Sequence, residues 1–525
     1  MIKEEKTMVD PRISEWMTVS EPSLKGRFFA MRKQMVGLLT LSLVCAAGNA
    51  QTTPPANTST TESTVVRQLN NVRFASQFAG VDAGAKIQAA QDDLPSTGGI
   101  IFADFEGNQT ISALHITKPV EIIFGGATFT VTSTINLTDL PNGPVVIRGI
   151  GRGQNARGTQ FKGETGGVLF DLTGAQYVTF ENIGVTEGSR NRSTVAFLFA
   201  RSATSGYCQF NVLRNVMVLM FTNPSANGGH GSVAVYNNAA EHFVVENSYL
   251  YADNPLVITG SNDLGIASAL TTHGTATTST GEMTVSGPTA LEVAKNGIGY
   301  PLYIEAAQDI NLQQAYMVSW GSINNDFAMR LKKVRSLTVN AHIEGVSRAA
   351  TISGFLQESK LHLTSNRPTT TSMIYLDTPN TYIDKSEIQA YPQSTTTDMF
   401  AGIDRTVQVR HSLVWLEANR GQERGLSNAA FPGTLFITDN GVGIGGTPSA
   451  TDATSNKYSF YAEVGAGKAV LSDGVTVGGM TGPTWTSGTG AKSGPCSPTG
   501  SLFTRTDGGA GSTLYVCERG TWAAK

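Results

Sequence analysis

Charged side chains are scarce in this chain. Asp, Glu, Lys and Arg make up 15% of its 525 residues, against about 25% in a typical soluble domain, whereas glycine is abundant, with 57 residues. Glycine and asparagine suit turns and threonine suits strands, so the composition favours β-structure with many turns. The net charge is −3, and no sustained basic run is present. Because proteins hold nucleic acid through clustered Lys and Arg, we expect no nucleic-acid partner.

No apolar stretch is long enough to cross a membrane. The longest covers roughly residues 35–47, whereas a bilayer needs about 20 apolar residues. Basic residues precede this stretch and small residues follow it, which is the pattern of a cleaved secretory signal. We therefore expect residues 1–50 to be an N-terminal extension and signal peptide, with Met31 as a candidate start. The mature chain would begin near Gln51, lack a transmembrane segment, and be secreted or displayed at the cell surface.

Cysteine is also rare, with four residues in the whole chain. Cys45 lies inside the predicted signal, so three cysteines remain after export to an oxidising compartment. Cys496 and Cys517 are the natural disulfide pair, whereas Cys208, in an apolar context, is expected to be a buried free thiol. The sequence indicates no metal site and identifies no cofactor.

The chain changes character after the signal. Residues 51–70 begin with a polar, low-complexity linker, and the folded body is expected over residues 71–420. Near its start, Ile87, Ala90 and Leu94 recur at helical spacing, which predicts a short amphipathic helix over residues 83–94. Such a helix could cover the open first rung of a stacked sheet.

Short β-branched and aromatic runs bounded by turn residues fill most of this body. Three of them share one pattern around Asn182, Asn215 and Asn247, which are separated by 33 and 32 residues. A repeat of this size indicates a solenoid. Asparagine tolerates the left-handed backbone region better than most residues, so we expect these three residues to form a ladder at one corner of successive coils. An antiparallel sandwich or propeller is the alternative, but Asn-Gly and Asp-Gly hairpin turns are scarce between these strands.

Later strand-like runs support the same interpretation. They begin near Ile310, Leu337, Leu361, Tyr382 and Val407, at separations of about 21 to 27 residues, which suits one coil for each run.

The opening of the body resembles a known family. The pattern Ile-Gln-Ala-Ala at residues 87–90, Leu-Pro-Ser-Thr-Gly-Gly at residues 94–99 and Gly-Ile-Gly-Arg-Gly at residues 149–153 is similar to the pectate-lyase superfamily, which includes phage tailspikes. The resemblance covers about 70 residues and implies an all-β fold: a single-stranded, right-handed parallel β-helix with a short N-terminal capping helix and a role toward polysaccharide. The glycines at 149–153 fit a turn and not a nucleotide-binding loop, because they open no helix.

The family's catalytic signatures do not carry over. Gly229-His230-Gly231 and Asn324-Asn325-Asp326 are similar to two elements of the polygalacturonases, but they stand in reversed order, and the paired aspartates of that group are missing from the coils. The basic and Ca²⁺-binding signatures of the lyases are absent as well.

A candidate site follows from strand periodicity instead. His342 and Glu344 are two residues apart, so a strand places them on one face, where they could act as base and acid. Asp253 and Asp326 are further catalytic candidates near strand ends. The candidate substrate-binding residues, whose rings could stack on sugars, are Tyr251, Tyr316 and Trp320. Each of these residues could equally be an ordinary member of a solvated sheet face.

The C-terminal part differs from the body. Residues 421–490 form a glycine-rich β segment similar to phage tail fibres, and residues 491–525 suggest a disulfide-linked hairpin module. Two functions follow: a lyase or glycoside hydrolase acting on polysaccharide, or a non-catalytic surface or fibre protein for glycan binding, adhesion or assembly. A homotrimer is one assembly compatible with the second.

Overall fold

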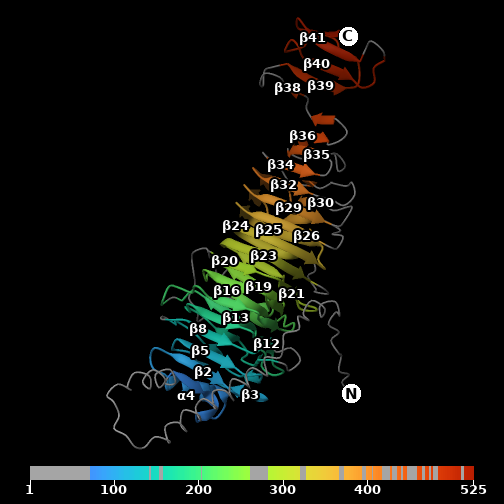
Figure 1. Ribbon diagram of the computed structural model, residues 1–525. Helices are drawn as coiled ribbons and strands as arrows, with labels where there is room; N and C mark the ends of the chain where they lie inside the picture. Colours follow the sequence, from blue (N-terminus) through green and yellow to red (C-terminus); the bar gives the residue numbers. More distant parts are fainter. Residues whose placement is uncertain are drawn as a thin grey trace, which may run out of the picture. The chain divides into compact units, whose positions relative to one another are not determined.

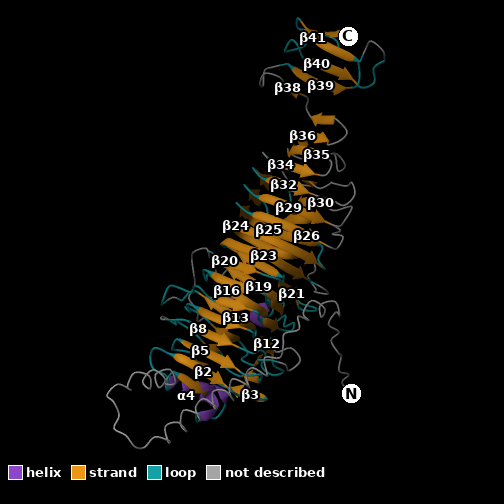
Figure 2. Cartoon of the chain, viewed as in Figure 1, coloured by secondary structure: helices purple, strands orange, loops and turns teal. Residues whose placement is uncertain are grey.

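The computed structural model describes residues 71–525 except 141–142, 153–157, 203, 261–281, 320–326, 366–371, 393–397, 405, 417–425, 428–433, 439–440, 446–457, 464–467, 472–474, 477–482 and 510–512. The described residues belong to one compact unit, Asn71–Lys525. Parallel strands stacked on one another dominate this unit (Figures 1 and 2).

In the first half of the body, each coil contributes one strand to each of three faces, and each strand pairs in parallel with its equivalents in adjacent coils. The first face contains β1 (Val72–Phe74), β2 (Gly99–Ala103), β5 (Val120–Phe124), β8 (Val145–Arg148), β11 (Val178–Glu181), β14 (Val212–Arg214), β17 (Phe243–Glu246) and β20 (Met283–Ser286). The second face contains β3 (Asn108–Ile111), β6 (Thr128–Val131), β9 (Gln160–Gly163), β12 (Gly184–Glu187), β15 (Met217–Leu219), β18 (Tyr249–Ala252) and β21 (Thr289–Val293). The third face contains β4 (Leu114–His115), β7 (Ile135–Asn136), β10 (Val168–Asp171), β13 (Val195–Ala200), β16 (Val233–Asn238), β19 (Asn254–Thr259) and β22 (Leu302–Glu305). The fold is a right-handed parallel β-helix, which confirms the predicted fold class and excludes the antiparallel alternative.

In the second half, some strands run through the corners between faces. β23 (Gln308–Val318) pairs with the first-face strand β20 and then with the second-face strand β21, and β24 (Phe327–Glu344) pairs along its length with β22 and both parts of β23. The parallel stack continues through β25 (Arg348–Gln357), β26 (Lys360–Ser365), β27 (Ser372–Leu376), β28 (Tyr382–Asp384), β29 (Glu387–Pro392), β30 (Asp398–Gly402), β31 (Gln408–Arg410), β32 (Leu413–Leu416), β33 (Leu426–Ser427) and β34 (Leu435–Thr438).

This register corrects part of the predicted coil spacing. Ile310 does pair with Leu337, one coil of 27 residues. Tyr382, however, pairs with Phe355 and not with Leu361, so the predicted step from Leu361 to Tyr382 crosses from one face to another. The spacing alone could not separate a full coil from a shorter step between neighbouring faces.

An α-helix closes the N-terminal end of the stack. Helix α4 (Ala83–Asp92) begins after Asp82, whose carboxylate accepts a hydrogen bond from the amide of Ala85 at 2.8 Å, a favourable N-terminal cap. Ile87, Ala90 and, just after the helix, Leu94 are buried in the main core, as the sequence pattern predicted. A one-turn 3₁₀ helix, η1 (Ala75–Gln77), precedes α4, and a second, η3 (Ala226–Gly229), follows β15.

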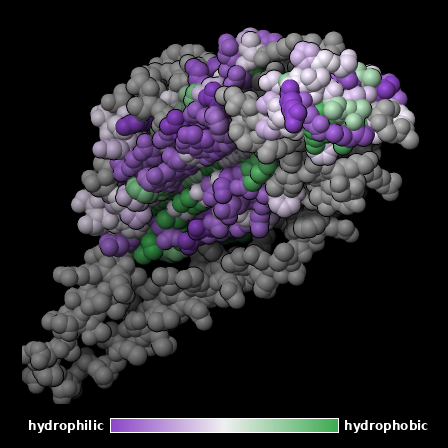
Figure 3. Space-filling view, turned by 90° about the horizontal axis from the view of Figure 1, so that it is seen from above, coloured by the Kyte–Doolittle hydropathy of each residue, from purple (hydrophilic) through white to green (hydrophobic). Residues whose placement is uncertain are grey.

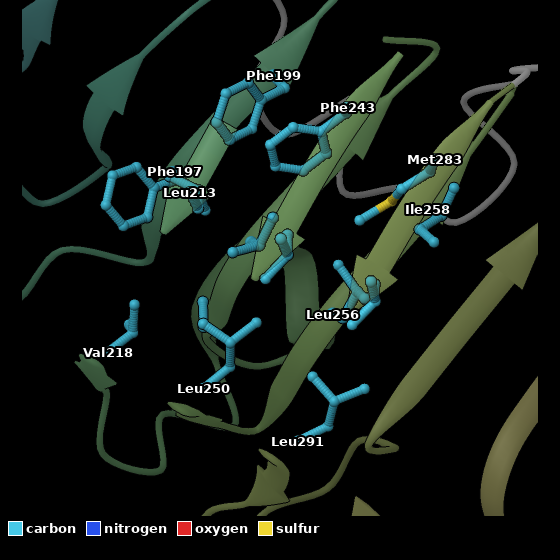
Figure 4. Packing of buried hydrophobic residues seen from close by; sticks show 14 of the residues in the cluster. Phe197, Phe199, Leu213, Val218, Phe243, Leu250, Leu256, Ile258, Met283 and Leu291 are labelled. Carbon is cyan, nitrogen blue, oxygen red and sulfur yellow. The ribbon is translucent and has the colours of Figure 1, made fainter. Parts of the chain in front are cut away.

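The interior of the helix is filled by stacked apolar side chains. Eight phenylalanines form a continuous group along the first coils: Phe124, Phe129, Phe161, Phe170, Phe180, Phe197, Phe199 and Phe243. Aliphatic side chains and Met283 continue the packing beyond them (Figure 4). In-register stacking places like residues above one another, so one apolar position per strand becomes a column of core residues.

The predicted asparagine ladder is present at the corner between the first and second faces. Asn182, Asn215 and Asn247 have φ of 57°, 54° and 48°, all in the left-handed region. The side-chain amide of Asn215 donates a hydrogen bond to Oδ1 of Asn182. Gly287 occupies the corner in the next coil with φ of 65°, and a Cβ there would lie 2.2 Å from Oδ1 of Asn247, so only glycine fits.

Arg152 adds a contact to this ladder that the sequence did not reveal. Its guanidinium donates through Nε to Oδ1 of Asn215 and through Nη2 to the carbonyl oxygen of Asn247, at 2.5 Å for the second bond. Burial lowers the pKa of Arg152 from its ordinary value. The segment after β8 therefore supplies a cation, Arg152, that contacts ladder residues two and three coils further along the chain.

Replacing a ladder asparagine should destabilise the helix in two separable ways. Asn215→Ala loses both side-chain hydrogen bonds and forces alanine into the left-handed region, so we expect a loss of about 2–4 kcal/mol. Asn215→Gly loses the same hydrogen bonds without the backbone strain, and should cost about 1–2 kcal/mol less. Calorimetric melting of the three proteins checks this expectation. Equal melting temperatures for the alanine and glycine variants would contradict the role of the left-handed corner.

Beyond β34 the pairing becomes antiparallel. β35 (Gly441–Gly445), β36 (Tyr458–Glu463) and β37 (Lys468–Leu471) follow β34 as a meander. A separate five-stranded sheet contains β38 (Val475–Thr476), β39 (Thr484–Gly488), β40 (Leu502–Arg505), β41 (Leu514–Glu518) and β42 (Thr521–Ala524).

Both predictions for the cysteines are confirmed. Cys496 and Cys517 are joined by a disulfide in the C-terminal sheet region, and Cys208 is buried and free. Burial raises the pKa of the Cys208 thiol far above its ordinary value, so this side chain stays protonated and unreactive.

Candidate functional site

The outward side of the second face carries the predicted site residues. Tyr316 on β23 pairs in register with His342 on β24, and Val318 pairs with Glu344. The residues between them, Met317 and Ile343, are fully buried, so strand alternation turns Tyr316, His342 and Glu344 toward solvent. We use the term outer second face for the outward side chains of the second-face strands from β18 to β32.

Tyr316, His342 and Glu344 form a connected cluster. The Tyr316 hydroxyl donates to Oε2 of Glu344 at 2.5 Å, and Nε2 of His342 lies 3.3 Å from Oε1 of the same carboxylate. The tyrosine and imidazole rings stack with centroids 5.5 Å apart and planes 4° apart. On its other side, Nδ1 of His342 lies 2.9 Å from the hydroxyl of Thr364. The histidine side chain is 39% exposed and the glutamate 16%, so both groups remain within reach of a ligand.

The coils before this cluster repeat its tyrosine–glutamate contact. The Tyr249 hydroxyl donates to Oε2 of Glu292 in the following coil at 2.6 Å, and the Tyr249 and Tyr251 rings lie 6.5 Å apart. Burial, with the nearby Glu292 carboxylate, raises the pKa of Tyr249 far above its ordinary value, so its hydroxyl remains a donor. Burial raises the pKa of Tyr251 as well, and its hydroxyl accepts a hydrogen bond from the amide of Lys295 at 2.9 Å.

The coils after the cluster add aromatic residues that the sequence interpretation missed. His362 on β26 lies 5.1 Å from Tyr391 on β29, ring centre to ring centre. Asn340, His362, Gln389 and Trp415 occupy one position in four successive coils, and Trp415 is 42% exposed. The signal that could have found them is alternation: Asn340, His362 and Gln389 each stand between two buried residues, and Trp415 follows the buried Val414.

The remaining predicted candidates do not join this cluster. Trp320 and Asp326 lie outside the described residues. Asp253 is fully buried, and its carboxylate accepts hydrogen bonds from the amides of Asn223, Ser232 and Ile298, at 2.8, 2.8 and 3.3 Å. These contacts hold the turns after β15 and β21, which is a structural role.

Glu187, at the end of β12, is a titratable residue that the sequence did not single out. It is 4% exposed, and Nε of Arg192 lies 3.8 Å from its carboxylate. Burial raises the pKa of Glu187 to about 7; Arg192 and a hydrogen bond from the backbone of Phe221 oppose the shift, and Asp253 adds to it. It lies two residues after the buried Val185, on the inner side of the strand.

The described residues offer neither a metal centre nor a membrane-spanning helix. Within the described part of the chain, no cluster of three or more His, Cys, Asp or Glu side chains could hold a metal ion. The described helices include none with the length and apolar character needed to cross a membrane.

The similarity of this chain to known proteins is a similarity of fold alone. No family model matches this chain, and no curated protein matches it. Among solved structures, the chain is similar to a family 28 exopolygalacturonase of Yersinia enterocolitica, with 11% identity over 72% of this chain and 79% of the other and a TM-score of 0.40. It is also similar to PfbA, a surface adhesin of Streptococcus pneumoniae, with 10% identity over 75% and 99% of the two chains and a TM-score of 0.33. A third similar structure is tailspike protein 2 of an Escherichia coli O157:H7 bacteriophage, with 10% identity over 66% and 42% and a TM-score of 0.30.

Proposed function

We propose that this chain is an exported polysaccharide-binding protein whose outer second face is the binding surface. The observation that supports this proposal best is the row of half-exposed rings and carboxylates around Tyr316, His342 and Glu344. Successive coils lie about 4.8 Å apart, so side chains from several coils can contact several sugar units of an extended chain. Rings offer apolar surfaces for sugar rings, and carboxylates accept hydrogen bonds from sugar hydroxyls.

A substitution at Tyr316 tests the binding surface. Covering the phenol ring with a sugar removes apolar area from water, at about 25 cal/mol per Å², or on the order of 1–2 kcal/mol. We therefore expect Tyr316→Ala to weaken binding to the glycan that the wild-type protein selects from a polysaccharide panel by about tenfold, measured by affinity electrophoresis or calorimetry. Tyr177→Ala is the matched control, because Tyr177 is 50% exposed but lies outside the second face. Equal losses for the two variants, or no loss for Tyr316→Ala, would rule out this surface.

Turnover of the bound glycan is the second candidate function, and the contact between His342 and Glu344 favours it. An imidazole beside a carboxylate is a pair that can exchange a proton with a substrate. Glu292 and Glu344 also occupy one position two coils apart, both opposite Val318. The coil spacing puts their backbones about 10 Å apart, a separation from which the two carboxyl groups can reach the roughly 6.5–9.5 Å used by a hydrolase that inverts configuration.

One variant, Glu344→Gln, distinguishes the two candidate functions. If the protein is an enzyme, Glu344→Gln should reduce turnover by at least about a hundredfold and leave glycan affinity within a few-fold of wild type. Reducing ends report hydrolysis, and absorbance of 4,5-unsaturated products reports a lyase. Wild-type protein that binds a glycan but releases neither product over hours is a binding protein.

A further inference from the structure

The C-terminal five-stranded sheet carries an exposed tryptophan that the proposed function does not use. Trp485, on β39, is 53% exposed. The view in Figure 3 shows a largely hydrophilic exterior with hydrophobic residues in narrow bands. Single apolar residues are nevertheless common on protein surfaces, so exposure alone does not mark a site. The orientation of the indole and the residues around it indicate one instead.

The indole of Trp485 is fixed across the sheet by its own N–H group. Trp485 pairs in register with Leu502 of β40, and its Nε1 donates a hydrogen bond at 2.9 Å to the hydroxyl of Thr504, two residues further along β40. A side chain that pointed straight away from the sheet could not reach this hydroxyl, so the ring leans over β40. One indole face is then turned toward the sheet and the other toward solvent, which agrees with an exposure of about one half.

The packed core of this sheet lies on the opposite side. Phe503 and Tyr515 are 4% and 5% exposed, and Cys517 is fully buried and joined to Cys496. The ring of Trp522 lies 6.3 Å from that of Phe503 on the same side. Because these residues hold the sheet together, Trp485 is not needed to fill its core.

Hydroxyl groups flank the exposed indole. Strand alternation puts Ser487 on the same side as Trp485, and Ser487 pairs in register with Thr504. A hydroxyl has one donor and two acceptor positions, so Thr504 can accept the indole N–H and still donate its own proton. The ring is therefore a fixed apolar platform with hydroxyls at one edge.

This arrangement fits one sugar ring better than a protein partner. A β-linked glucose or galactose unit has a face that carries only C–H groups, which packs on an aromatic ring, and hydroxyls at its edge, which exchange hydrogen bonds with protein hydroxyls. An indole with one open face offers on the order of 100 Å², whereas a stable protein interface needs about 800 Å² from each partner. The neighbouring Leu502 and Val516 are already half-buried and add little.

We infer that Trp485, Ser487 and Thr504 form a second sugar site, which takes a single hexopyranose unit with an apolar face, such as β-linked glucose or galactose. This site goes beyond the proposed function, because it belongs to another sheet and needs no ligand long enough to contact several coils.

Titration of the full chain with trisaccharides tests this inference. Cellotriose and β-1,4-galactotriose are the probes, and tryptophan fluorescence reports a sugar that stacks on an indole. We expect a saturable change in emission with at least one probe. Trp485→Phe should remove this change, whereas Trp415→Phe, at a tryptophan of the β-helix that is 42% exposed, should retain it. By calorimetry, Trp485→Ala should weaken binding about tenfold, and Thr504→Val, which keeps the side-chain volume but releases the indole N–H, about threefold.

The alternatives give different results. A change in emission that survives in Trp485→Phe or disappears in Trp415→Phe would overturn the inference. So would the absence of a response to both probes up to about 50 mM, a concentration that saturates sites of millimolar Kd. Self-association of the wild-type chain that Trp485→Ala abolishes in sedimentation would show that a second copy covers the indole instead.

Two further measurements keep the outcome clear. Near-ultraviolet circular dichroism shows whether Trp485→Ala retains its fold; if it does not, Thr504→Val decides, and an unchanged affinity in that variant would overturn the inference. Tyr316→Ala should leave the emission change intact. The proposed function is tested by long glycans at Tyr316, so a failure at Trp485 leaves it in place.

Discussion

Phe170→Ala should lower the free energy of unfolding by about 3–5 kcal/mol, the range for removing a large aromatic side chain from a packed core. Phe170 is fully buried, and its ring centre lies 5.2 Å from Phe161, 4.9 Å from Phe180 and 5.0 Å from Phe197. It therefore contacts one ring of its own coil and two rings of the next coil. Alanine at this position leaves a cavity between two coils, which side chains fixed by in-register stacking cannot easily close.

Calorimetric melting and denaturant titration measure this effect. Phe170→Leu retains most of the apolar volume and should cost about 1–2 kcal/mol, so the difference between the two variants isolates the cavity. A melting temperature for Phe170→Ala within about 1 °C of wild type would show that the neighbouring rings collapse into the space, contrary to close packing at this position.

Glu187→Gln should stabilise the protein above neutral pH. Burial raises the pKa of Glu187 from 4.5 to about 7, so the folded state binds a proton more tightly than the unfolded state. The wild-type stability is therefore highest below the unfolded pKa, falls as the pH rises between about 4.5 and 7, and stays lower above that range. A shift of this size corresponds to about 3 kcal/mol, which we reduce to about 2 kcal/mol because the partly exposed Arg192 can move closer to the carboxylate.

Melting temperatures of wild type and Glu187→Gln between pH 4.5 and 8 show this effect directly. The two curves should nearly coincide at the acid end and separate above pH 7, with the glutamine variant higher. Glu106→Gln, at an exposed glutamate, should follow wild type throughout. If the Glu187→Gln curve runs parallel to wild type at every pH, ionisation of Glu187 carries no cost in the folded protein.

The repetitive part of the fold could be predicted from sequence because it rests on local patterns. The spacing of Asn182, Asn215 and Asn247 by 33 and 32 residues matches three coils whose corners lie above one another. The same spacing separates Tyr177, Phe210 and His242, which stack at another corner with φ of 59°, 57° and 51°. That second stack was missed because aromatic residues do not normally mark left-handed corners.

The second half of the helix was harder to predict. Left-handed residues there include Gln314 and Lys333, neither of which is a residue type that normally marks a turn. Strands β23 and β24 therefore pass through the corners without a visible break in the sequence.

Only those residues of the candidate site that strand alternation and coil spacing bring together could be predicted from the sequence. Alternation placed His342 and Glu344 on one side, and coil spacing placed Tyr316 beside them, which the structure confirms. Burial of Asp253 and Glu187 depends on the turns of their own and adjacent coils, and a pattern along one strand contains no information about those contacts.

The arginine of the early glycine-rich turn changes how the coils depend on one another. In a solenoid, each repeat is stabilised mainly by its immediate neighbours, so the ends can fray while the middle stays folded. Arg152 donates hydrogen bonds to residues 63 and 95 positions later in the chain. It therefore couples coils that are not immediate neighbours. Opening any coil between β8 and β17 disturbs the hydrogen bonds of this side chain. These coils should consequently exchange their amide hydrogens as a single cooperative unit, with closely similar protection from Val145 to Glu246.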